Sequence, residues 1–181
     1  MPGKSPKEAI DNFAQYFKES LSCVTAGWVT AFQESRNLYK ITCDPPAKLS
    51  KRSGGNLFII ATQVLTAVPD PNAEGRFKAQ FKAKTREYSY RLVEEGNIAA
   101  PDIVAYHWHP NDSDLRTPHL HVAAVPRVHF PTSRVCLEDF IEMTIRYFEV
   151  RPTMKYSEWS AILDKNKRAF EMMASWKVQH P

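Results

Sequence analysis

The side chains best suited to chemistry are four of the chain's six histidines, which lie within fifteen residues as two His-x-His pairs, His107 with His109 and His119 with His121. Side chains alternate along a β-strand, so the two members of each pair share a face. If the two segments form an antiparallel hairpin, all four rings converge. Imidazole is a ligand for transition metals. The spacing therefore predicts a site for one divalent transition metal, with zinc, manganese or nickel as the candidates.

The loop between the two pairs carries Asp112 and Asp114. Either carboxylate can serve as a further metal ligand, or orient a ligating histidine through a hydrogen bond.

A histidine site can also work without metal, because imidazole titrates near neutral pH. In phosphodiester cleavage one histidine would take a proton from a ribose 2′-hydroxyl, and a second would protonate the leaving oxygen. The predicted catalytic set is then the four histidines, with Arg91 or Arg116 stabilising the charge that develops on phosphate. The alternative is structural: the four rings fill sheet positions and are hydrogen-bonded there.

Residues 76–93 show the clearest alternation in the chain, which predicts one long strand. Small and aromatic residues fall on one face, and the other face is basic. A row of cations matches the spacing of nucleic-acid phosphates, and tyrosines that follow in the strand can stack on bases. The predicted nucleic-acid-binding residues are Arg76, Lys78, Lys82, Lys84, Arg86, Tyr88 and Tyr90.

The elements that would position these residues form an α+β fold. Ser5-Pro6-Lys7-Glu8 is typical of a helix start, so a helix is expected over residues 6–21. Two strands joined by a turn are expected over 24–42, and a loop over 44–55. Residues 56–68 fit a buried strand or a short helix. Strands at 103–109 and 119–125 precede two helices, the second beginning near Ser157.

The 181 residues are expected to form a single domain, residues 1–181, with a mainly antiparallel sheet, one N-terminal helix and two C-terminal helices. Mean hydropathy is −0.43, and the absence of a long apolar run argues against membrane association. The net charge of +4 is mildly basic. The three cysteines form no motif, and no signal peptide is visible, so the expected compartment is the cytoplasm.

Residues 88–122 resemble the TumE-type toxins of bacterial toxin–antitoxin pairs. The similar features are a Tyr-Ser-Tyr-Arg strand (88–91), an aromatic–histidine strand (106–109) and a Pro-His-x-His strand (118–121). The resemblance implies a small cytoplasmic α+β protein that acts on RNA and is restrained by a cognate antitoxin-like protein.

His119-Leu120-His121 is also similar to the His-hydrophobe-His motif of rolling-circle endonucleases, in which a metal ion and a helical tyrosine nick DNA. Here the available tyrosines are Tyr147 and Tyr156, and neither is followed by lysine three residues later. Three functions are thus expected, in this order: a histidine-dependent phosphodiesterase acting on RNA, a non-enzymatic metal-stabilised or partner-binding module, and a metal-dependent DNA-nicking enzyme.

Overall fold

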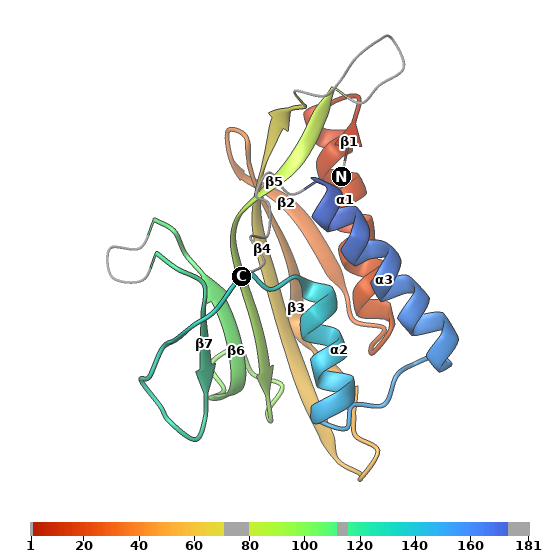
Figure 1. The fold of residues 1–181 in the computed structure, drawn as a ribbon, viewed down its shortest axis with the longest axis vertical. Coiled ribbons are helices and arrows are strands. Elements are labelled where there is room, and N and C mark those ends of the chain that lie inside the picture. The colour runs from red at the N-terminus through yellow and green to blue at the C-terminus, as the bar shows by residue number, and fades with distance from the viewer. Residues whose placement is uncertain (1, 71–79, 112–115, 174–181) are drawn as a thin grey trace.

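The N-terminal helix, α1 (Pro6–Ser22), begins where its capping residues predict. The backbone N–H of Glu8 donates to Ser5 Oγ at 3.2 Å, and Glu8 Oε2 accepts from the N–H of Lys4 at 2.7 Å. The first contact satisfies a backbone donor that the first turn leaves free, and the second satisfies the N–H of the residue before the N-cap. In the computed structural model, which describes residues 2–70, 80–111 and 116–173, α1 packs against one face of a large sheet (Figure 1).

The described part of the sheet has eight strands, and every pairing is antiparallel. The spatial order runs β2-β3-β4-β5-β6-β7-β8, and β1 pairs with β5. The strands are β1 (Pro2–Gly3), β2 (Val29–Ser35), β3 (Leu38–Ser50), β4 (Asn56–Pro69), β5 (Phe81–Val93), β6 (Asp102–Trp108), β7 (His119–Val122) and β8 (Phe130–Pro131).

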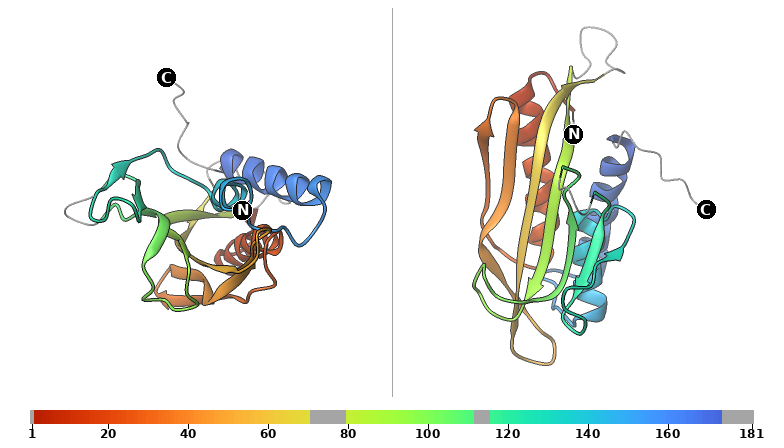
Figure 2. Two further views of the ribbon diagram at one scale, coloured as in Figure 1. Left: turned by 90° about the horizontal axis from the view of Figure 1, so that it is seen from below. Right: turned by 90° about the vertical axis from the view of Figure 1, so that its left-hand side faces the viewer.

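Two further helices, α2 (Leu137–Tyr147) and α3 (Tyr156–Met173), lie on the same side of the sheet as α1 (Figures 1 and 2). Phe140 of α2 is fully buried against the rings of Tyr90 and Tyr106, at centroid distances of 5.8 and 6.1 Å. Trp159 and Leu163 of α3 join the same core. The predicted α+β class, with one helix before the main sheet and two after it, is confirmed.

The structure differs from the predicted elements at two places, and at a third it decides between the two predicted alternatives. Residues 44–50 continue β3 instead of forming a loop, because a bulge between Cys43 and Ala47 absorbs the two prolines. The apolar run after Gly55 is a strand, β4, whose alternate side chains enter the core. The strand that begins at His119 ends at Val122, and the chain then turns back to form β8, which was not expected.

A bulge in β5 decides which side chains face the helices. Glu87 pairs with Val64 and Thr85 pairs with Leu65, which leaves Arg86 as an extra residue. An extra residue exchanges the faces of everything that follows it in the strand. Ala83 is buried before the bulge, whereas Tyr88 and Tyr90 are buried after it. Ser89 and Arg91 consequently lie on the outer face, away from the helices.

None of the helices among the described residues has the length and hydrophobicity that a membrane-spanning helix requires. Cys23, Cys43 and Cys136 are all buried and unpaired, as their spacing predicts.

Candidate metal centre

Strands β6 and β7 are neighbours, as the convergence of the histidines requires. His107 lies directly opposite His119, and Ala105 lies opposite His121. All four predicted histidines therefore occupy the outer face of the sheet. Their rings are close: His107 lies 5.6 Å from His109, 5.7 Å from His119 and 5.0 Å from His121, measured between centroids.

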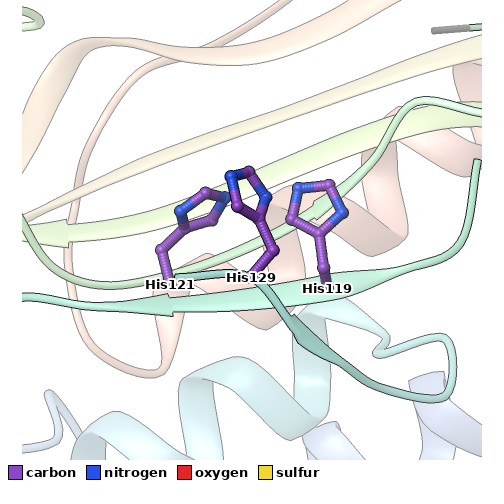
Figure 3. A group of neighbouring side chains, drawn as sticks. All are labelled: His119, His121 and His129. Atoms are coloured by element: carbon purple, nitrogen blue, oxygen red, sulfur yellow. The ribbon is translucent and has the colours of Figure 1, made fainter. Parts of the chain in front are cut away.

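A fifth histidine, His129, completes the cluster. It precedes β8, whose Pro131 pairs with His119, so the antiparallel return brings His129 beside His121. The ring centroid of His129 lies 4.3 Å from that of His121 and 5.0 Å from that of His119. Figure 3 shows the three rings rising from the same side of this hairpin.

His119, His121 and His129 form the group that can hold a metal ion, because one nitrogen from each lies within 4.8 Å of the others. A zinc ion about 2.1 Å from each nitrogen needs them roughly 3.4 Å apart, a difference that small ring rotations can close. We call these three residues the three-histidine group. This group is not the set of four histidines predicted from the sequence. It includes His129, and it leaves out His107 and His109.

The three-histidine group has a buried side at His119 and a solvent-exposed side at His129. His119 is 4 % exposed, and its Nδ1 lies 3.0 Å from the carbonyl oxygen of Thr117. An Nδ1–H donor at this contact leaves Nε2 free to bind metal. His121 is half-buried and His129 is exposed. The group thus has an anchored inner ligand and an outer side open to solvent.

His107 lies beside the group and is held neutral. Burial, followed by the nearby charges of His121, His109, His119 and Arg91, lowers the pKa of His107 to about 3. Burial also lowers the pKa of His121, together with the neighbouring His129 and His119, while Asp102 acts in the opposite direction. Neutral imidazole is the form that binds metal, so the shift of His121 favours ligation by the three-histidine group.

The remaining predicted site residues are placed as follows. His109 lies at the outer end of the cluster, with Nδ1 3.8 Å from Glu87 Oε2. Asp112 and Asp114 lie outside the described residues. Arg116 is exposed, three residues before β7.

Arg91 lies on the histidine face, but its guanidinium group already has three partners. Nε donates to Asp102 Oδ1 at 2.5 Å, and the two terminal nitrogens donate to the carbonyl oxygens of Ile98 and Ala100, each at 2.8 Å. These bonds use three of the five N–H groups of Arg91, so a contact with phosphate would rest on the remaining two. Its assignment as a phosphate-binding residue stays a prediction.

The predicted nucleic-acid face is divided by the β5 bulge. Lys84 and Arg86 are exposed and Lys82 is half-buried, while Arg76 and Lys78 lie outside the described residues. Tyr88 and Tyr90 are 3 % and 0 % exposed and stack on each other in the core, at 4.9 Å. The prediction that they stack on bases is corrected, because the extra residue at Arg86 turns them toward the helices.

The two tyrosines considered as nucleophiles belong to the helix layer. Tyr147 ends α2 and Tyr156 begins α3, and they are 77 % and 66 % exposed. Both helices pack on the face of the sheet opposite the histidines. Neither tyrosine has a ring contact with a histidine among the described residues.

No protein-family model, curated protein or solved structure matches this chain. The arrangement of its own residues therefore carries the functional argument.

The sequence offered a weak signal for His129, which was not predicted as a ligand. It lies eight residues after His121, beyond a segment that contains Pro126. Such a segment is typical of a chain reversal. A short return strand would have brought His129 to the same sheet edge.

Proposed function

We propose that this protein is a metal-dependent phosphodiesterase that cleaves nucleic acid, with RNA as the substrate. The observation that carries the proposal is the three-histidine group, with His119 anchored and His129 open to solvent. Catalytic zinc sites use three protein ligands and leave a position for water or substrate. Among the candidate ions, zinc matches an all-imidazole ligand set best.

The absence of charge on the three imidazole ligands supports an anionic substrate. Three neutral imidazoles do not offset the charge of a divalent ion, which when bound would polarise a phosphoryl oxygen and activate water. Lys84, Arg86 and Arg116 are exposed cations on β5 and before β7, and they would attract a phosphodiester chain. The resemblance to TumE-type toxins supports RNA as the substrate, and a cognate protein as the restraining partner.

The environment of His107 argues against this ring as the general base of an acid–base mechanism. A general base works best when its pKa lies near the working pH. The pKa of His107 is lowered to about 3, so this ring holds a proton poorly at neutral pH. His107 is better suited to line the site or to act as a further neutral ligand.

The decisive experiment combines metal analysis with RNA cleavage. Purified untagged protein should contain about one equivalent of zinc, and His119→Ala/His121→Ala should lose it. The same variant should cleave RNA about 100-fold more slowly or worse. Tyr147→Phe, on the opposite face of the sheet, is the matched control and should retain both metal and activity.

A double variant that still cleaves RNA at the normal rate would refute the proposal. Stability is compared in the metal-free state, where the variant and the natural protein should melt at similar temperatures. That comparison separates loss of the site from loss of the fold.

A metal-stabilised module that binds a protein is the second candidate. The ion pair of Arg91 with Asp102 favours it, because this carboxylate already offsets the charge of the cation predicted to stabilise the transition state. In that case metal would be present, RNA would stay intact, and the double variant would lose stability or partner binding. DNA nicking would instead give a covalent protein–DNA adduct that disappears in Tyr147→Phe or Tyr156→Phe.

A further inference from the structure

A small cavity lies within the helix layer, on the opposite face of the sheet from the histidines. Its volume is about 20 Å³, which accommodates a single water-sized occupant. Phenylalanine, tyrosine and leucine side chains of α1, α2 and α3 form much of its lining. Three polar side chains complete it: Gln63 of β4, Glu138 of α2 and Asn166 of α3. We call this the polar cavity.

Two oxygen atoms of residues that line the polar cavity have no hydrogen-bond partner in the part of the chain that the structure describes. They are Gln63 Oε1 and Asn166 Oδ1, on side chains that are 2 % and 0 % exposed. Buried acceptors are rarely left unpaired, because the lost hydration is not replaced.

The amide nitrogens of the same two residues are already engaged. Asn166 Nδ2 donates to the carbonyl oxygen of Tyr16 at 3.2 Å and to Ser20 Oγ at 3.0 Å. Gln63 Nε2 donates to the hydroxyl of Tyr90. These bonds leave the two amide oxygens as the groups available to an occupant of the cavity.

The third polar group, Glu138, is a carboxyl group that has no cationic partner among the described residues. It is 7 % exposed, and Oε1 accepts from Ser20 Oγ at 2.6 Å. None of the ion pairs found among residues 2–70, 80–111 and 116–173 includes it. Nearby Lys167 pairs with Asp139 instead, at 2.5 Å. Burial raises the pKa of Glu138, as expected for an uncompensated carboxyl group.

We propose that the polar cavity binds one monovalent alkali cation, Na⁺ or K⁺, through the oxygen atoms of Gln63, Asn166 and Glu138. A water molecule could donate to the two amide oxygens, but it would leave a buried negative charge. A proton on Glu138 would remove that charge, so water and a proton together are the rival occupants that the test must exclude. A cation satisfies all three groups, and its preference for hard oxygen ligands matches this set. One carboxylate balances one monovalent charge.

The test measures the thermal midpoint of the whole protein in sodium, potassium and choline chloride at equal ionic strength. EDTA is present throughout, so that the three-histidine group contributes nothing. Because a ligand of the folded state raises stability, sodium or potassium should raise the midpoint by about 2 °C or more relative to choline. Glu138→Gln should abolish the difference, and the matched control Glu95→Gln, in an exposed loop, should keep it.

Equal midpoints in the three salts would overturn the proposal in favour of a water molecule or a protonated Glu138. If Glu138→Gln fails to fold, Gln63→Leu provides a second variant, which should weaken the salt preference. A crystal of the natural protein soaked in Tl⁺ gives a direct measurement, because anomalous density is expected between the three oxygen atoms. Absence of that density would also count against the site.

Discussion

His119 is the best anchored of the clustered histidines. Its ring is 4 % exposed, and its Nδ1 lies 3.0 Å from the carbonyl oxygen of Thr117. A ligand fixed in this way loses little side-chain freedom when a metal binds. His129 is exposed and has more freedom to lose. We therefore expect His119 to contribute more than His129 to any metal affinity of the three-histidine group.

At the scale of single residues, His107 should make the metal-free protein sensitive to acid. Its pKa is about 3 in the folded protein, and about 6.5 in an unfolded chain. Between these values the unfolded chain binds a proton that the folded protein does not. Stability is therefore lost as the pH falls from about 6.5 toward about 3.

Replacing His107 with Gln should remove this contribution. In EDTA, the free energy of unfolding of both proteins should fall between about pH 7 and about pH 4. The fall should be about 1–3 kcal/mol smaller for His107→Gln than for the natural protein. Urea denaturation at a series of pH values measures it. Parallel stability curves for the two proteins would show that His107 is not the group responsible.

At the scale of elements, the histidine strands depend on α2, which packs behind them. Phe140 is fully buried and contacts Tyr90 of β5 and Tyr106 of β6. Tyr106 pairs in turn with Leu120, which lies between His119 and His121 in β7. One face of this hairpin is thus fixed by the helix layer, and the other carries the rings.

Phe140→Ala should therefore destabilise the protein by about 3–5 kcal/mol, because it removes a large ring from a packed core. Urea denaturation gives the value. Tyr147→Ala in the same helix is the control, and should change stability by less than about 0.5 kcal/mol because the side chain is exposed. A small effect at Phe140 would mean that the β6–β7 hairpin is held independently of α2.

At the scale of the whole molecule, the fold has a core that needs no metal. Buried residues of α1, α2, α3 and four strands, β3 to β6, join one hydrophobic cluster, while the histidines lie toward one edge of the sheet. Small domains that unfold without zinc lack such a core. Metal bound here would add stability to a structure that already exists.

Chelation should accordingly lower the thermal midpoint by several degrees without unfolding the protein at room temperature. Circular dichroism with and without a chelator measures both effects. If the chelated protein lost its secondary structure, the histidines would be a structural centre. That result would favour the non-enzymatic module over the phosphodiesterase.

Several features of the structure could be predicted from local signals in the sequence. Ser5, Pro6 and Glu8 determine where α1 begins, because a cap depends only on neighbours in the chain. The two His-x-His pairs share a face because alternation is a property of any strand. Their convergence also followed once β6 and β7 formed a hairpin, the simplest connection for sequential antiparallel strands.

Other features depended on distant contacts. Whether 56–68 formed a strand was settled by pairing with β3 and β5. The bulge at Arg86 reversed the faces of β5, so that Tyr88 and Tyr90 entered the core and Ser89 and Arg91 faced outward. A shift of one residue leaves the local pattern almost unchanged, yet it moves every later side chain to the other face.

The composition of the three-histidine group was likewise decided by tertiary structure. The sequence alone determined that imidazoles would gather on one sheet face. Only the return of the chain through β8 placed His129 beside His119 and His121. The same holds for the polar cavity, whose three polar residues are far apart in the sequence. Ligand sets of this kind depend on distances between separate segments, which packing of the whole chain fixes.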